Sequence, residues 1–197
     1  MKKRLNAEEE IVLKNKLNEE DRKKLRDLSQ ILLWLDSYHD IFSDFDPRYY
    51  SIRALSEDFL AEIKRASRDK PTGEIELRFL VPSDKRNKQD EIVIKKRLSE
   101  HFDRHFNIVK KEAKKTLIQG LSFIFFGVLL MVLTTFFLVH NVGENILFTF
   151  LAVLFEPGGW FLFWEGLDIV IFNYRRMKPN LEFYKKMAGS NISFYSY

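Results

Sequence analysis

The sequence predicts a mainly α-helical membrane protein, in which a small α+β cytoplasmic N-terminal domain and a long helix lead into a two-helix transmembrane hairpin. Residues 116–143 contain no Asp, Glu, Lys or Arg, although 30% of the whole chain is charged. A second apolar stretch follows at 146–172, and basic residues flank both outer ends of the pair. Because the chain has no cysteine, it offers neither disulfides nor a thiolate metal site.

The first part of the chain, 1–115, is expected to fold as a soluble domain. After a short amphipathic helix near 7–16, apolar residues recur at steps of three and four over 19–43, and Asn18 is a good helix cap. This spacing predicts a coiled-coil helix whose seam packs against another helix of this chain or of a second copy. The seam consists of Leu25, Leu28, Leu32, Leu35, His39 and Phe42.

A helix and a strand are predicted next in this domain. Residues 56–66 have the periodicity of a helix, with Phe59, Leu60 and Ile63 on its inner face. Residues 74–81 alternate between charged and apolar side chains, as in a half-buried strand. Since a lone strand cannot satisfy its backbone, we expect it to pair with 48–54 in a β-α-β arrangement, or alternatively with 91–94.

From about residue 90 the pattern is helical again and contains neither Pro nor Gly before Leu117. We therefore expect one long helix that continues into the first span. His101 and His105 lie four residues apart on this helix, but no third ligand is evident, so we interpret them as surface histidines and expect no metal. No nucleophile motif, acid–base pair or phosphate loop is present in the sequence, so we expect neither enzymatic activity nor a cofactor.

The two spans are predicted at 117–139 and 146–172. The first, with 23 residues, reaches roughly 34 Å, enough for a hydrocarbon core of about 30 Å. The second reaches roughly 40 Å if straight, so it must tilt, kink or break. The short link 140–145 favours an antiparallel hairpin spanning 116–172, and a re-entrant turn at Pro157 is the alternative.

Basic residues set the expected orientation. By the positive-inside rule both termini lie in the cytoplasm, including the basic, aromatic tail 173–197, and in a prokaryote the membrane is the plasma or inner membrane. We expect these side chains to contact anionic lipid headgroups rather than nucleic acid. They are Lys110, Lys111, Lys114, Lys115, Arg175, Arg176 and Lys178.

Small residues recur seven apart in both spans, which keeps each set on one face of its helix. Pairing the spans about their link brings Gly120 opposite Gly166 and Gly127 opposite Gly159. Thr134 and Ala152 form the third pair. Because helices associate in lipid through close contact between small residues, this register predicts the packing of the hairpin.

Three carboxylates interrupt the second span. Asp168 is expected to pair with Lys114 and Lys115 near the cytoplasmic end, and Glu165 lies about one turn deeper. Glu156 lies near the bilayer midplane, where an unpartnered charge is costly. It precedes a predicted helix break at Pro157, Gly158 and Gly159, and the Trp160 indole is a candidate donor to its carboxylate.

Two functions are consistent with this pattern. The first is an oligomeric membrane-anchored scaffold or sensor, whose cytoplasmic domain interacts with a protein partner and whose Glu156 joins copies as a neutral acid. The alternative is an oligomeric channel or ion and proton permeation unit that uses Glu156 at the helix break. A third interpretation of Glu156 is that it lines a ligand or lipid pocket. Each function implies a homo-oligomer, because two helices rarely enclose a pore.

Overall fold

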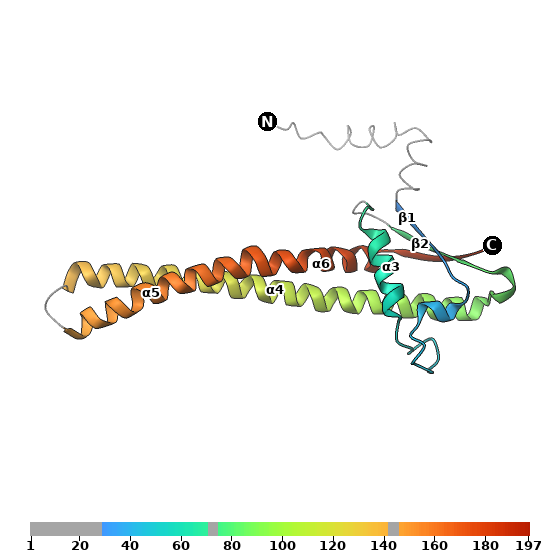
Figure 1. Ribbon diagram of the computed structural model, residues 1–197, viewed down its shortest axis with the longest axis horizontal. Coiled ribbons are helices and arrows are strands. Elements are labelled where there is room, and N and C mark those ends of the chain that lie inside the picture. The colour runs from blue at the N-terminus through green and yellow to red at the C-terminus, as the bar shows by residue number, and fades with distance from the viewer. Residues whose placement is uncertain (1–28, 71–74, 142–145) are drawn as a thin grey trace, which may run out of the picture. The chain divides into compact units, whose positions relative to one another are not determined.

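The computed structural model describes residues 29–70, 75–141 and 146–197 (Figure 1). The chain divides into two compact units. The sheet unit comprises the residues up to Phe102 together with Lys186–Tyr197, and the hairpin unit comprises Asp103–Lys185. The fold is mostly helical, with one small sheet.

Three strands form the sheet of the sheet unit: β1 (Gln30–Trp34), β2 (Glu76–Val81) and β3 (Asn191–Ser196). They lie in the order β1-β2-β3, and both pairs are parallel. Parallel strands need long crossover connections. The first crossover contains η1 (Tyr38–Ile41) and α3 (Glu57–Ser67), and the second contains η2 (Ser83–Lys85) and the entire hairpin unit.

The core lies on one face of this sheet. Ile31, Leu77 and Ile192 are register partners across the three strands, and all three are buried. The Phe59 ring of α3 lies 5.8 Å from that of Phe79 on β2. The first turns of α4 (Lys88–Asn141) add further core side chains, which are fully buried: Ile94, Leu98 and Phe102.

The predicted helix at 56–66 and strand at 74–81 are confirmed as α3 and β2. The Ser56 side chain accepts a hydrogen bond from the Phe59 N–H and so caps α3. The predicted partners of β2 are wrong: residues 48–54 form turns, and residues 91–94 belong to α4. The true partners come from 30–34 and 191–196, stretches that were interpreted as part of a helix and part of a tail.

The predicted coiled-coil helix is wrong wherever the structure describes it. Leu32 lies in β1, and His39 lies in the short 3₁₀ helix η1 rather than on a leucine seam. After Gln30 the residues of β1 are continuously apolar, as strands of parallel sheets tend to be. The spacing of these apolar residues also fits a heptad, although they form a strand. The predicted helix at 7–16 and the part of the seam at 19–28 lie outside the described residues.

In the hairpin unit, α4 continues without interruption to Asn141, which confirms one long helix. Among the described residues, α4 is the one helix that is long and apolar enough to cross a membrane; its most apolar 18-residue window has a mean hydropathy of 2.5. Figure 1 shows α5 (Ile146–Asp168) running back along α4. A π-helical turn, η3 (Ile169–Asn173), then leads into α6 (Tyr174–Ala188).

The predicted helix break at Pro157 is wrong, and so is the re-entrant turn there. Pro157 lies inside α5, and the helix continues through Gly158 and Gly159. A proline removes one backbone donor but does not have to end a helix whose other hydrogen bonds are kept. The irregular backbone occurs instead at η3, directly after Asp168.

Candidate functional site

The small residues of the two apolar helices meet along the contact between α4 and α5. A Cβ atom added at Gly127 would lie 2.6 Å from the backbone nitrogen of Phe163 and 2.8 Å from the carbonyl oxygen of Gly159. One added at Gly159 would lie 2.8 Å from the Met131 Cγ and 3.1 Å from the Gly127 oxygen. The two backbones therefore touch where any larger side chain would hold them apart.

Of the other two pairs of the seven-residue register, Gly120 and Gly166 are in close contact, and Thr134 and Ala152 line the same cavity. A Cβ atom at Gly166 would lie 2.7 Å from the Gly120 oxygen and 2.7 Å from the Ile124 nitrogen. Thr134 and Ala152 are both buried and line a small cavity of about 110 Å³. The Thr134 hydroxyl has no hydrogen-bond partner among the described residues. We call this line of contacts the glycine seam: Gly120, Gly127, Thr134, Ala152, Gly159 and Gly166.

Glu156 lies on the outside of the hairpin rather than on the glycine seam. Its side chain is exposed, and no hydrogen bond or ion pair joins it to any other described residue. The Trp160 ring does not serve as its donor. It stacks on Phe163 at 6.2 Å and meets the edge of Trp164 at 5.6 Å. Glu156 therefore lacks any polar partner that the described part of this chain could supply.

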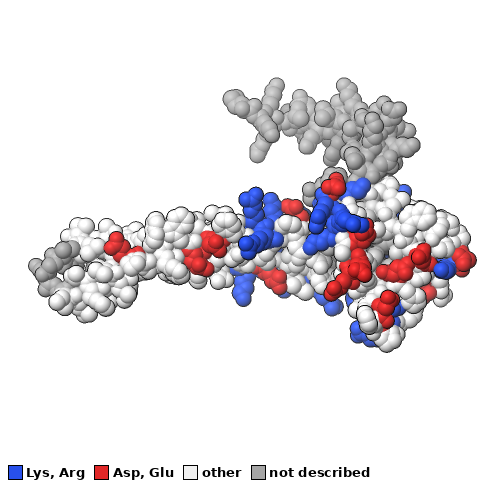
Figure 2. Space-filling view, in the orientation of Figure 1, with Lys and Arg blue, Asp and Glu red and all other residues white. Residues whose placement is uncertain are grey.

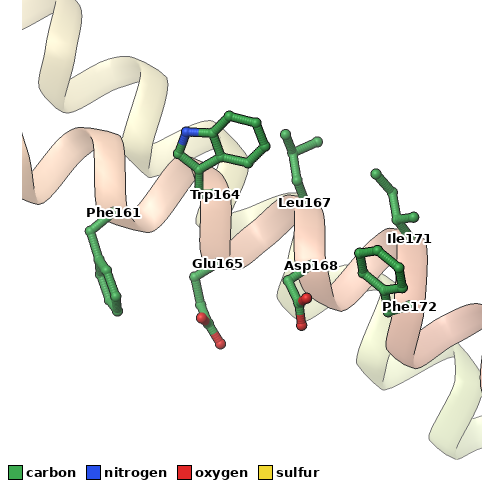
Figure 3. A pocket seen from close by; sticks show the side chains of 7 residues that line it. All are labelled: Phe161, Trp164, Glu165, Leu167, Asp168, Ile171 and Phe172. Atoms are coloured by element: carbon green, nitrogen blue, oxygen red, sulfur yellow. The ribbon is translucent and has the colours of Figure 1, made fainter.

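Glu165 and Asp168 line a different feature, an open groove of about 340 Å³ along α5 and η3. Figure 3 shows both carboxylates pointing to the same side of the helix as Phe161, while Trp164 and Leu167 point the other way. No ion pair between Asp168 and either Lys114 or Lys115 occurs among the described residues. The carboxylates of the second span thus lie in two separate places, and Glu156 does not line the groove.

The basic residues gather beyond the apolar part of the hairpin. Figure 2 shows the hairpin as a largely uncharged surface interrupted by a few acidic side chains, with Lys and Arg clustered past its apolar end. The seven basic residues that the sequence predicts at the headgroups are all exposed: Lys110, Lys111, Lys114, Lys115, Arg175, Arg176 and Lys178. Lys178 makes a long, exposed ion pair with Glu182 at 3.8 Å. Such side chains are free to meet an anionic surface.

The two histidines of α4 each contact an aromatic ring. His105 stacks on Tyr184 at 5.4 Å, and His101 meets the edge of Phe102 at 5.6 Å. Among the described residues, no group of three or more His, Cys, Asp or Glu side chains converges as a metal site would require.

A loop of the sheet unit was not foreseen as a surface of interest. Phe45 is 98% exposed, and Tyr49 and Ile52 are largely exposed nearby. The loop is nonetheless held in place, because Asp46 accepts hydrogen bonds from the Arg48 guanidinium at 2.8 Å and from the Ala54 N–H at 2.7 Å. These bonds hold the pKa of Asp46 well below its usual range. Beside the loop, a cavity of about 490 Å³ is lined partly by acids: Asp44, Glu57 and Asp58.

A partly buried polar cluster holds the start of α4 in place within the sheet unit. Glu91 accepts hydrogen bonds from the Arg86 guanidinium and from the Tyr38 hydroxyl, both at 2.8 Å. Burial alone would raise the pKa of Glu91, but these two donors outweigh it and lower the pKa. Arg86 also donates to the Phe194 carbonyl of β3. The cluster thus ties η1 and β3 to the start of α4.

The chain matches no family model, no curated protein and no solved structure. What the protein does is therefore inferred from the geometry of its two units. The glycine seam, the exposed Glu156 and the parallel pairing of β2 with β3 are the features that bear on function.

Proposed function

We propose that the protein is an integral membrane protein that crosses the bilayer twice and holds the sheet unit at the cytoplasmic surface as an interaction domain. In this proposal it acts as an oligomeric scaffold or sensor. The observation that carries the proposal is the pairing of β2 with β3, two strands that flank the entire hairpin unit in sequence.

The strand pairing supports an even number of crossings. β2 and β3 are neighbours in register from Glu76↔Asn191 to Val81↔Ser196, so the chain must leave and return on the same side of any membrane. If α4 crosses, the chain has to cross back between residues 141 and 191. The 23 residues of α5 reach roughly 34 Å, and α5 packs against α4 along the glycine seam. This helix is the natural return span.

The basic flanks support a cytoplasmic sheet unit. Lys and Arg residues precede the first span and follow the second. In membrane proteins the segments rich in these residues stay on the cytoplasmic side. The same residues are exposed and would meet anionic headgroups, each contributing about 1 kcal/mol of attraction near a charged surface.

The position of Glu156 supports a homo-oligomer. It lies ten residues after Ile146, roughly 15 Å along α5 and so near the middle of a bilayer. A charge facing lipid at that depth costs from about 3 to more than 10 kcal/mol, depending on how it is measured. Since the described residues of this chain offer it no partner, a neighbouring copy is the simplest source of a hydrogen bond.

The exposed loop supports an interaction role for the sheet unit. Phe45 has nearly its whole side chain in solvent although its loop is pinned by Asp46 and Arg48. Large apolar side chains held outward on an ordered loop are typical of surfaces that bind other proteins. The acidic cavity beside it would favour a partner with a basic segment.

A permeation unit is the second candidate, favoured by one observation. Because Glu156 lies on the outside of the hairpin, copies that meet at this face could place several carboxylates around a common axis. Flux of protons or cations into vesicles that contain the purified protein would support this role. Absence of flux across the pH range in which a carboxylic acid titrates would exclude it.

Alkaline carbonate extraction tests the membrane proposal. The full chain should stay in the membrane pellet, because two apolar helices hold it there. A variant with Leu154→Lys and Phe161→Lys, both on the exposed side of α5, should be released or degraded. Release of the wild-type chain would contradict integral insertion.

A further inference from the structure

One exposed side of α5 presents two carboxylates on an apolar surface. Glu165 and Asp168 line the open groove of about 340 Å³ together with apolar and aromatic side chains, and none of the residues that line it is basic. Neither carboxylate forms a hydrogen bond or an ion pair with another described residue. Figure 3 shows both of them on the same side of the helix as Phe161. Such a groove fits a group with an apolar stem and a cationic end, as in a lysine side chain.

Lysines of α4 offer this chemistry, but they point the wrong way to offer it within one chain. At about 100° of rotation per residue, Asp168 lies roughly 160° around α5 from Gly166, and Lys115 lies roughly 140° around α4 from Gly120. Since Gly120 and Gly166 are in contact, both charged side chains point away from the contact between the helices. They therefore lie on opposite sides of the hairpin, which explains why Asp168 and Lys115 form no ion pair in this chain.

The opposite charges lie at nearly the same level along the hairpin. Asp168 is two residues after Gly166, and Lys115 is five residues before Gly120. These separations correspond to roughly 3 Å and 7.5 Å along the helices toward the same end, so the levels differ by roughly 4.5 Å. A lysine side chain can span this offset by extending its stem along an apolar surface. Two hairpins that stand side by side in the same orientation would thus bring Asp168 of one copy to Lys115 of the next.

Exposed apolar side chains extend each charged surface along its helix. The basic face of α4 consists of Lys111, Lys115, Ile118, Phe125 and Leu129, and the acidic face of α5 consists of Phe150, Leu154, Phe161, Glu165 and Asp168. In lipid an apolar stripe alone does not select a partner, because lipid tails are equally apolar. Anionic headgroups are repelled by the carboxylates, so the acidic face selects a cation, and the basic face of another copy supplies it at the matching level.

We propose that the acidic face of one copy docks against the basic face of the next copy. The contact is heterologous, because two different surfaces meet. Since the two faces lie on opposite sides of the hairpin, each copy engages two neighbours. Copies related by rotation about the membrane normal close into a ring through contacts of this kind. This inference rests on the proposed function, because it names the surfaces that join the copies of the proposed homo-oligomer.

Cross-linking in the membranes of cells that co-express two differently tagged single-cysteine variants tests the contact, and the natural chain has no cysteine. Phe125 and Phe161 lie two residues from Gly127 and Gly159 respectively, toward the same end of the hairpin, and so at one level. A short bis-maleimide should join Phe125→Cys to Phe161→Cys at least about tenfold more than it joins either variant to itself, since only the mixed pair is held close together.

The matched control replaces Phe161→Cys with Trp160→Cys. Trp160 is 55% exposed and Phe161 is 66% exposed, but the two side chains point about 100° apart around α5. Trp160→Cys should therefore link far less to Phe125→Cys. A chain that carries both Phe125→Cys and Phe161→Cys should give a ladder of products that ends at the size of the ring.

Charge reversal tests the ionic part of the contact. Asp168→Lys in both cysteine variants should lower the mixed product at least about tenfold, because like charges then face each other. Adding Lys115→Asp to the same chains should restore the product, since the pair is then reversed rather than removed. A mixed product that ignores Asp168→Lys, or that Lys115→Asp does not restore, would overturn the pairing.

Two further results would overturn the docking itself. Either variant may not link to itself as well as to the other, because equal self-linking would show a symmetric contact between identical faces. No mixed product from chains that stay in the carbonate pellet and remain oligomeric by light scattering would exclude this contact and leave the proposed function standing. Release of the wild-type chain from the pellet would overturn both.

Discussion

The close packing of the hairpin predicts how alanine substitutions at three glycines change its stability. A Cβ atom at Gly127 would lie 2.6 Å from the Phe163 nitrogen, about 0.8 Å short of the 3.4 Å at which ordinary contact begins. The obstacle is backbone, so the helices themselves must separate. At Gly158, one residue before the seam glycine Gly159, the nearest atom is the Leu130 Cδ2 at 3.8 Å, which is an ordinary contact.

The magnitudes follow from these distances. When two packed surfaces separate by 0.5–1 Å, each van der Waals contact along the glycine seam loses roughly a quarter to a half of its attractive energy. Overpacking of a close contact costs about 1–3 kcal/mol, so we expect Gly127→Ala and Gly159→Ala to destabilise the hairpin by that amount. Gly158→Ala should be neutral or stabilising by up to about 1 kcal/mol, because alanine is the better helix former.

Reversible unfolding of the purified protein in mixed micelles measures this difference. The three alanine variants carry the same chemical change, and two of them are neighbours on one helix. We expect Gly127→Ala and Gly159→Ala to unfold at clearly lower denaturant than wild type, with Gly158→Ala at or above it. Equal stability of all three would refute the close contact between α4 and α5.

Three further predictions concern Glu156, Glu91 and the exposed loop. If Glu156 joins copies as a neutral acid, Glu156→Gln should keep the oligomer and Glu156→Leu should loosen it, as measured by light scattering in detergent. If Glu156 conducts ions, the Gln variant should keep the oligomer but lose ion flux. The lowered pKa of Glu91 means that its contribution to stability is present above the ordinary value of 4.5 and is lost as the pH falls through the lower folded pKa. Glu91→Gln should therefore lower stability at pH 7 and flatten its acid dependence, which denaturation from pH 7 to pH 3 would reveal; an unchanged profile would contradict the Arg86–Glu91 pairing. Asp46→Ala should release the loop that holds Phe45 and raise amide hydrogen exchange there by about tenfold or more, while exchange in β2 stays slow.

Strong local patterns predicted the elements that such patterns can encode. The alternation of EIELRFLV identifies β2, and the lack of Pro and Gly between residues 90 and 117 identifies one long α4. The helical periodicity of residues 56–66 identifies α3 (Glu57–Ser67). In each case the deciding information lies within one continuous stretch of the sequence.

Strand pairing could not be predicted in the same way. β3 lies 110 residues after β2 in the chain, and its sequence NISFYS follows a basic helix that resembles a membrane-flanking tail. β1 contains an apolar run that fits a buried strand and a heptad seam equally well. Only the tertiary structure separates these readings.

In the candidate site, too, the local pattern predicted one feature and not another. Seven-residue spacing predicted which small residues would face each other, because helix periodicity fixes the faces. The expected partners of the carboxylates were not found, because the partner of a side chain depends on its position in three dimensions. Trp160 packs on rings, and Asp168 lines an open groove.

Thiol accessibility in sealed membrane vesicles tests the central proposal, two crossings with both ends of the hairpin on one side, most directly. Single cysteines at Asp84, Asn141 and Lys185 would report on the chain before, between and after the two apolar helices. A membrane-impermeant maleimide should label Cys at 84 and 185 from the cytoplasmic side only, and Cys at 141 from the opposite side only. Labelling of position 141 from the cytoplasmic side, or of positions 84 and 185 from opposite sides, would contradict the account.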